Sequence, residues 1–144
     1  MYRILPLFLL ALLAQTKTTP SQQQSWEQIR AVAEAQHEIV MLLIQNKEFD
    51  RVSDATLVIF ELHFPPQYEY LLVEEASLLS DVLSHSHQIL IAHQVVDQAL
   101  QSVKTNKSMA ALCREKAYLY KKEGKADDAI EMFEKSKQYE QKQP

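Results

Sequence analysis

Three histidines are the residues of this sequence best suited to metal chemistry. His85, His87 and His93 fall within nine residues, and imidazole is the commonest protein ligand for transition metals. His87 and His93 are six residues apart, which would place them on opposite sides of a helix. Neither a His-Glu-x-x-His pattern nor a Cys-x-x-Cys-His haem motif is present. We therefore expect solvated turn and groove histidines, no bound metal and no cofactor.

The remaining polar residues do not form a recognisable catalytic set. Glu34 and Glu38 flank His37 on one predicted helix, a spacing that is typical of a solvated face. Tyr118 and Lys122 stand four residues apart, as in one oxidoreductase motif, but the sequence lacks the glycine-rich nucleotide loop that should accompany them. It also lacks a nucleophile beside a base and paired carboxylates at a useful spacing. The sequence therefore predicts a protein that is not an enzyme.

Composition narrows the class of fold. The chain has 144 residues, enough for one domain, and its 47% apolar and 24% charged residues are ordinary for a globular protein. It contains a single glycine, whereas phosphate-binding loops, nucleophile elbows and tight hairpins all need this residue. The single cysteine, Cys113, cannot form an intrachain disulfide, and its apolar neighbours predict a buried hydrophobic residue. These counts favour a helical protein that its apolar core stabilises.

The first residues have the three-part pattern of a secretory signal peptide. Arg3 precedes an apolar run that ends at the small residue Ala14, and a polar stretch follows over 15–20. The run is shorter than the roughly 20 residues of a membrane-spanning helix. We predict a signal peptide over 1–14 with cleavage between 14 and 20, a flexible lead-in over 15–24 and a single helical-repeat domain over 25–144. The exported protein would be periplasmic or extracellular, without a stable membrane span once the signal is cleaved.

Apolar residues recur at helical spacing along the rest of the chain, with polar or proline-containing breaks between them. Ser25, with Gln28 three residues later, forms a capping-box pattern at the start of the first helix, and Gly124 supplies a left-handed stop for the fifth. The expected helices cover about 26–45, the stripe from Val52 to Leu62, Pro66 to Leu83, Ile89 to Val103, a segment through Leu112 and Tyr120, and a segment through Ala129 and Tyr139. The sequence thus predicts an all-α fold of about six helices.

Such helices can form an up-and-down bundle or a stack of helical hairpins, and an internal repeat favours the stack. The last hairpin carries small and aromatic residues at set intervals: Ala117, Tyr120, Gly124, Ala129, Phe133 and Ser136. Over residues 108–141 this pattern resembles a tetratricopeptide repeat, with departures at Cys113 and Lys116, and residues 26–104 match it more loosely. Val52, Ala92 and Ala129 share one repeat position at intervals of 40 and 37 residues, longer than the family's 34. The resemblance implies three stacked antiparallel hairpins in a right-handed array.

The resemblance also implies that the first helix of each hairpin lines a concave groove. The positions carried over by spacing are Glu34, His37, Met41 and Ile44, then Glu74, Ser77, Asp81 and Ser84, then Ala111, Arg114, Tyr118 and Lys121. Arg114 and Lys121 lie about two helical turns apart with Tyr118 between them. This set could hold an acidic side chain or a C-terminal carboxylate of a partner.

Charge is distributed unevenly along the chain. Residues 21–100 contain three basic and twelve acidic residues, whereas 101–144 contain ten basic and seven acidic ones. A polarised surface of this kind could orient a partner or stack copies head to tail. The negative total and the interleaving of bases with acids argue against nucleic acid. We expect the partner to be another protein or a peptide, and the three hairpins also allow a homo-oligomer.

These features together predict an exported, non-catalytic protein–protein interaction module, such as an adaptor, scaffold or assembly factor, that uses a tetratricopeptide-like groove. Two alternatives stay open. One is a periplasmic helical bundle that binds a metal or small ligand through His85, His87 and His93. The other is a self-assembling structural unit, because three hairpins are the fewest that normally form a stable stack.

Overall fold

The computed structural model describes residues 25–142, so the predicted signal peptide and lead-in lie outside the described residues. The described residues form six α-helices and no strand, which confirms the expected all-α fold for this part of the chain. The helices are α2 (Trp26–Gln45), α3 (Val52–Phe60), α4 (Glu69–His85), α5 (Ile89–Ser102), α6 (Asn106–Lys122) and α7 (Ala126–Gln141), with short 3₁₀ helices η2 (Phe49–Arg51) and η3 (Pro66–Tyr68). Within these residues no helix combines the length and the apolar composition that crossing a bilayer requires.

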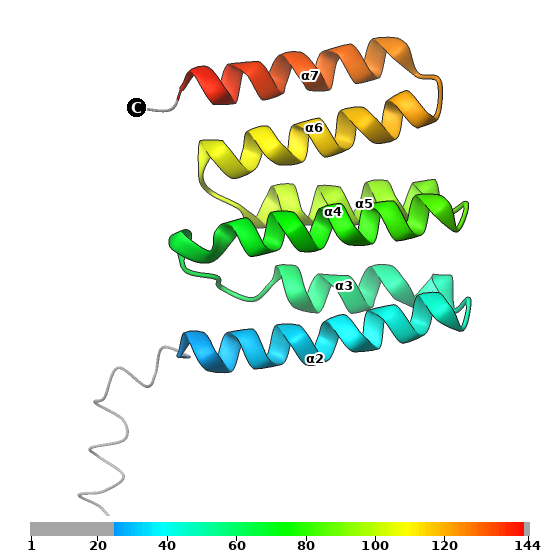
Figure 1. The fold of residues 1–144 in the computed structure, drawn as a ribbon, viewed down its shortest axis with the longest axis vertical. Helices are drawn as coiled ribbons and strands as arrows, with labels where there is room; N and C mark the ends of the chain where they lie inside the picture. Colours follow the sequence, from blue (N-terminus) through cyan, green and yellow to red (C-terminus); the bar gives the residue numbers. More distant parts are fainter. Residues whose placement is uncertain (1–24, 143–144) are drawn as a thin grey trace, which may run out of the picture.

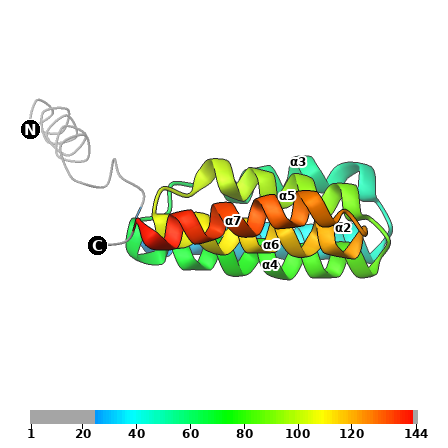
Figure 2. The same ribbon diagram turned by 90° about the horizontal axis from the view of Figure 1, so that it is seen from above.

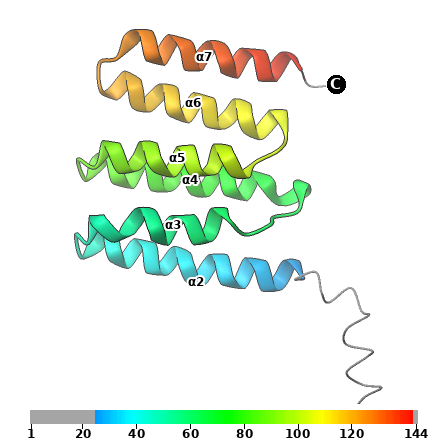
Figure 3. The same ribbon diagram turned by 180° about the vertical axis from the view of Figure 1, so that it is seen from behind.

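Successive helices pair into three antiparallel hairpins that stack along the long axis of the molecule (Figure 1). The hairpins contact one another through α3 and α5, through α4 and α6, and through α5 and α6. Seen along the stack, α3 and α5 lie on one side and α4 and α6 on the other (Figure 2). The reverse view shows α2 at one end of the stack and α7 at the other (Figure 3). One apolar cluster, with members such as Val40, Leu79, Val96 and Leu112, runs through all three hairpins from α2 to α6.

The three hairpins turn in the same way. The left-handed residues in the turns are Lys47 (φ 59°), His87 (φ 59°) and Gly124 (φ 74°). The N–H of each left-handed residue bonds to the carbonyl oxygen three residues earlier, and the next N–H bonds to the carbonyl oxygen five residues earlier. These are the two hydrogen bonds of a Schellman motif. The turns are 40 and 37 residues apart, so the backbone repeats at the intervals that the sequence indicated.

Side-chain caps set the start of two helices. Ser25 Oγ accepts a hydrogen bond from the Gln28 N–H, and Gln28 Oε1 accepts one from the Ser25 N–H, so the predicted capping box is confirmed. Thr105 caps α6 by accepting a hydrogen bond from the Ser108 N–H. Both caps satisfy N–H groups that have no partner within the helix.

The connection between α3 and α4 differs from the expectation. α3 ends at Phe60 rather than at Leu62, and α4 begins after a 3₁₀ turn rather than at Pro66. The prolines at 65 and 66 cannot donate a backbone hydrogen bond, and proline disfavours helical backbone in the residue before it. The resulting irregular connection carries Phe64 and Tyr68 to the start of α2, where both rings contact Trp26.

Buried polar side chains link neighbouring hairpins. Thr56 Oγ1 of α3 donates to Gln98 Oε1 of α5 at 2.7 Å, and Gln98 Nε2 donates to the Ser53 carbonyl oxygen at 2.9 Å. Lys116 Nζ of α6, almost buried, lies 2.8 Å from Asp97 Oδ1 of α5. Lys116, one of the two departures from the tetratricopeptide pattern, thus reaches a carboxylate on the previous hairpin.

Cys113 is buried in α6, as expected for a small hydrophobic residue. Burial raises the pKa of its thiol, more than the nearby positive charges of Lys135 and Arg114 lower it. Since the thiolate is the reactive form, this environment disfavours thiol chemistry.

Candidate functional site

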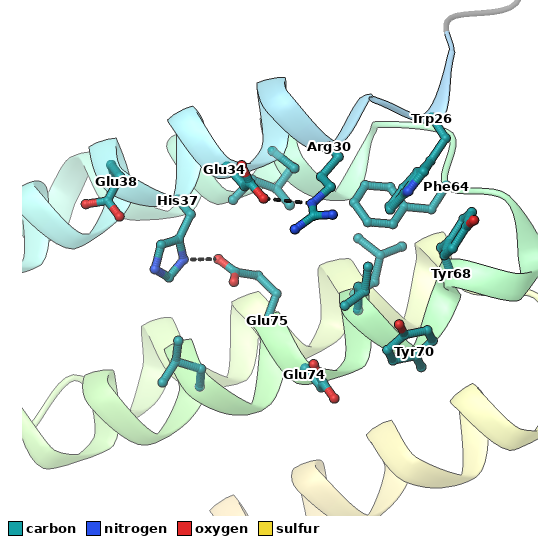
Figure 4. A pocket seen from close by; sticks show the side chains of 15 residues that line it. Trp26, Arg30, Glu34, His37, Glu38, Phe64, Tyr68, Tyr70, Glu74 and Glu75 are labelled. Carbon is teal, nitrogen blue, oxygen red and sulfur yellow. Dashed lines mark hydrogen bonds and ion pairs between the residues drawn. The ribbon is translucent and has the colours of Figure 1, made fainter. Parts of the chain in front are cut away.

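A groove runs between α2 and α4, the first helices of the first two hairpins. It has a volume of about 600 Å³, and side chains of both helices and of the connection before α4 line it (Figure 4). Leu71, Leu72 and Ile59 form part of its apolar wall. Leu78 lies further along α4 and is 47% exposed within the groove. A concave surface with exposed apolar side chains is typical of a binding site.

Aromatic side chains gather at one end of this groove. The rings of Trp26 and Tyr68 stack with centroids 4.1 Å apart and 8° between their planes, and Phe64 meets Trp26 edge-on at 5.2 Å. Tyr70 lies near them and is 53% exposed (Figure 4). The cluster offers a large apolar surface with polar ring edges, a composition that favours contact with both apolar and polar groups of a partner.

Carboxylates form most of the polar rim. The charged or titratable lining residues are Glu34, Glu38, Glu74 and Glu75 together with Arg30 and His37. Arg30 Nε donates to Glu34 Oε1 at 2.8 Å along α2, and His37 Nδ1 of α2 lies 2.7 Å from Glu75 Oε1 of α4 (Figure 4). The groove lining therefore has four carboxylates against one arginine and one histidine, an excess of acidic side chains.

The predicted groove residues of α2 divide between the groove and the core. Glu34 and His37 line the groove, as does Glu74 from α4. Met41 is half-buried and packs against the core. Ile44 is only 6% exposed, so its assignment to the groove is wrong. It follows Val40 by four residues and therefore lies on the core face of α2.

The other predicted positions of α4 contact the third hairpin. Ser77 Oγ donates to Glu115 Oε1 at 2.9 Å. Lys122 Nζ donates to Ser84 Oγ at 3.0 Å and lies 3.5 Å from Asp81 Oδ1. These contacts join α4 to α6, so this part of the predicted concave surface is an inter-hairpin contact.

The predicted carboxylate clamp of α6 is not assembled. Arg114 Nη1 donates to Ser136 Oγ at 3.1 Å and to Glu140 Oε1 at 3.0 Å, both on α7. Tyr118 is half exposed and meets Phe133 edge-on at 5.3 Å, and Lys121 is exposed. Because α7 already holds the Arg114 guanidinium, the two cations do not present a common site. Ala111 is half-buried beside them.

The predicted repeat-packing residues of the last hairpin are Ala117, Tyr120, Gly124, Ala129, Phe133 and Ser136. The two alanines and Ser136 are buried, while the two aromatic rings are partly buried. Ser136 Oγ donates to the Ala110 carbonyl oxygen at 2.9 Å, which joins α7 to α6. Tyr120 contacts the His93 ring at 4.6 Å, so the aromatic position fills the space between the second and third hairpins. Small residues thus lie where α6 and α7 approach closely.

The three clustered histidines have different neighbours. His85 lies in the last turn of α4 rather than in the turn after it, and its Nδ1 is 2.7 Å from the Asp81 carbonyl oxygen. His87 is the left-handed turn residue. His93 is buried rather than solvated, with Nε2 2.8 Å from Glu123 Oε2. Across residues 25–142 no three His, Cys, Asp or Glu side chains are placed to hold a metal ion together.

Burial raises the pKa of the Glu123 carboxyl, but the hydrogen bond and charge of His93, with Lys125, outweigh burial and leave the pKa below its ordinary value. The His93–Glu123 pair therefore favours an ionised carboxylate where α5 meets α6. This is a structural contact between the second and third hairpins.

Several groove residues were missed by the sequence analysis. Trp26, Tyr70 and Leu78 fall within helices that the sequence predicts, but spacing does not place them at the groove, and it gives no role to Arg30 or Glu75. One signal was available, because the leucines of α4 at 71, 72, 78 and 79 cover more of the helix than a single core stripe needs. Apolar residues beyond that stripe either meet another element or lie exposed.

No family model, curated protein or solved structure that we compared with this chain matches it. The tetratricopeptide resemblance therefore rests on the residues quoted above.

Proposed function

We propose that this protein is an exported, non-catalytic protein–protein interaction module that binds a segment of its partner in the groove between α2 and α4. The single observation that carries the proposal is the combination in one groove of exposed Leu78 and Tyr70 with four carboxylates. Exposed apolar surface of this kind is stabilised when a partner covers it. The tetratricopeptide resemblance supports the same role, and export rests on the pattern of residues 1–20 alone.

The groove favours a partner segment that combines apolar and basic side chains. Apolar side chains would cover Leu78 and the Trp26–Tyr68 aromatic cluster. Lysine or arginine would approach the exposed carboxylates of Glu34, Glu38 and Glu74. This proposal replaces the acidic or carboxylate partner that Arg114 and Lys121 suggested, because Arg114 is paired with Glu140. An amphipathic helix laid in an apolar groove is a common mode of peptide recognition.

The tryptophan of the groove provides a direct assay, since Trp26 is the only tryptophan of the chain. The probes are two short amphipathic helical peptides with the same leucine face, one with lysine and one with glutamate on its polar face. Titration with the lysine peptide should change Trp26 fluorescence. In the Glu34→Lys/Glu74→Lys variant its dissociation constant should rise about tenfold or more, equivalent to about 1.4 kcal/mol, because like charges then meet at the rim.

The matched control is Glu131→Lys/Glu134→Lys on α7, which makes the same change in net charge away from the groove. Both of these glutamates have surface lysine partners, Lys135 and Lys137, as Glu34 has Arg30. The control variant should bind the lysine peptide as the unmodified protein does. An equal response to the two peptides, an unchanged Trp26 emission, or equal weakening in both variants would overturn the proposal.

A further inference from the structure

The face of α2 that points away from the groove carries an apolar stripe. Val32, Ala35, Ile39 and Leu42 follow one another at intervals of three, four and three residues, which keeps them on one side of the helix. Val32, Ile39 and Leu42 are 42%, 47% and 54% exposed. We call these four residues the α2 end stripe. It lies on the helix that ends the stack (Figure 1).

Charge is segregated between the two sides of α2. Arg30, Glu34 and Glu38 line the groove, and they are all the Arg, Lys, Asp and Glu residues of α2 except Glu27. Ile39 follows the groove residue His37 by two positions, about 200° around the helix. The four stripe residues are uncharged, and Val32 and Ile39 lie nearly opposite the groove, whereas Ala35 and Leu42 are within one turn of Glu38.

The apolar face extends to α3. Gln36, one turn from both Val32 and Ile39, donates from Nε2 to the Ala55 carbonyl oxygen at 2.9 Å, which places Ala55 beside the stripe. Val58, one turn after Ala55, is 43% exposed. The first hairpin thus exposes apolar side chains from both of its helices, with Asp54 one turn before Val58.

The opposite end of the stack is mostly polar, although Ile130 of α7 is exposed there. The exposed residues of α7 include Asp127, Asp128, Glu131, Glu134 and Lys137. Terminal units of a helical stack need a polar outer face unless something covers them. Head-to-tail stacking would bury the charges of α7 against apolar side chains, a costly arrangement. Head-to-head contact buries apolar surface on both copies. Because the stripe contains no charged residue, this contact does not bring like charges of two stripes together.

We propose that the α2 end stripe is covered by a second copy of this chain in a two-fold, head-to-head dimer. An antiparallel arrangement of the two α2 helices centred beside Ala35 sets Val32 of each copy opposite Ile39 of the other. The small side chain of Ala35 lets the helices approach at the axis. Both grooves stay open, because they lie on the other side of α2, so this proposal does not depend on the proposed peptide binding.

Light scattering on the full-length chain measures the molecular mass directly. We expect twice the mass of one chain, and a return to the single mass in the Ile39→Gln/Leu42→Gln variant. The matched control is Leu90→Gln/Ile130→Gln, which alters two exposed apolar residues of α5 and α7 and should leave the dimer intact. Helical circular dichroism shows that each variant is folded. A monomeric parent protein, a dimeric stripe variant or a dissociated control would overturn the proposal.

Cross-linking locates the contact independently. Ala35 and Ala126 are both exposed alanines, at opposite ends of the stack, and the native Cys113 is buried. With a short bis-maleimide, Ala35→Cys should give a cross-linked dimer and Ala126→Cys should not. A dimer from Ala126→Cys alone, or one that forms only when the two variants are mixed, would overturn the head-to-head arrangement.

Discussion

At the scale of single residues, Glu69 is a carboxylate buried in the first turn of α4. Its oxygens accept hydrogen bonds from the backbone N–H groups of Lys104 and Thr105, at 3.1 and 2.9 Å, and from the Thr105 hydroxyl at 2.7 Å. Burial raises the pKa of this carboxyl, but the hydrogen bonds from Thr105, Ser108 and Lys104 outweigh burial and lower the pKa from 4.5. The ionised side chain thus joins the start of the second hairpin to the start of the third.

Glutamine at this position removes the charge while keeping the shape. We expect Glu69→Gln to lower the free energy of unfolding at pH 7 by about 2 kcal/mol, the size of a hydrogen bond to a charged group. Because the folded-state pKa is lowered, the native contribution is complete above about pH 4.5 and is lost as the pH falls through the folded-state pKa. Urea unfolding at pH 7 and at pH 3 should show the gap between the two proteins narrowing.

The control for this measurement is Glu61→Gln, which changes an exposed carboxylate at the end of α3. Its unfolding free energy should stay within about 0.5 kcal/mol of the parent protein, as for most surface substitutions. A Glu69→Gln gap that does not depend on pH would contradict a role for the ionised carboxylate.

At the scale of elements, the turns inside the hairpins share one backbone conformation but not one residue type. Gly124 adopts the left-handed conformation freely, whereas Lys47 and His87 adopt it against the steric preference of residues with a Cβ atom. The chain therefore carries local strain in the first two turns. The Schellman hydrogen bonds and the packing of the flanking helices hold both residues in place.

This strain predicts a stabilising substitution. His87→Gly should raise the free energy of unfolding by about 1 kcal/mol, because glycine is the favoured residue at this position of a helix end. The comparison is His85→Gly, two residues earlier and within α4, which should lower it by about 1 kcal/mol through the cost of glycine in a helix. Urea unfolding of both variants at pH 7 checks the opposite signs. Destabilisation by both would show that the His87 side chain has a role beyond the turn.

At the scale of the whole molecule, α2 has two functional faces in these proposals. The groove face carries Arg30, Glu34 and His37, and the opposite face carries Val32 and Ile39. One helix can offer a different surface to each of two partners when the two sets of side chains lie on opposite sides of it. Peptide binding and dimerisation should therefore be separable by substitution.

Because the two faces are separate, each pair of substitutions should change one property and leave the other unaffected. Ile39→Gln/Leu42→Gln should halve the molecular mass and leave the dissociation constant of the lysine peptide within about twofold, since neither residue lines the groove. Glu34→Lys/Glu74→Lys should weaken the peptide and leave the dimer mass unchanged. Light scattering and Trp26 fluorescence on the same two preparations test both halves. Loss of both properties in one variant would show that the two faces are coupled.

Most of the helices were predictable because their signals are local. The Ser25–Gln28 capping box, the prolines at 65 and 66 and Gly124 each act within one turn of the residues they affect. The left-handed turns at Lys47 and His87 were not predictable in the same way, because neither residue type favours that conformation. The Schellman hydrogen bonds and the packing of the flanking helices together hold that conformation there.

The candidate site was less predictable. Spacing placed Glu34, His37 and Glu74 at the groove, but it also placed Ile44 there, which the structure buries in the core. Position along a helix gives the direction of a side chain relative to its own axis. It does not give the neighbouring helix that covers that direction.

The sequence by itself determined the helical class, the helix caps and the interval between hairpins, since these depend on backbone preferences and on contacts between residues close along the chain. Only the tertiary structure decided that Arg114 pairs with Glu140, that Trp26 meets Phe64 and Tyr68, and that Ile39 stays about half exposed. The physical reason is distance along the chain. Residues 26 to 42 positions apart meet in these contacts, and their meeting follows from how hairpins pack rather than from any local preference.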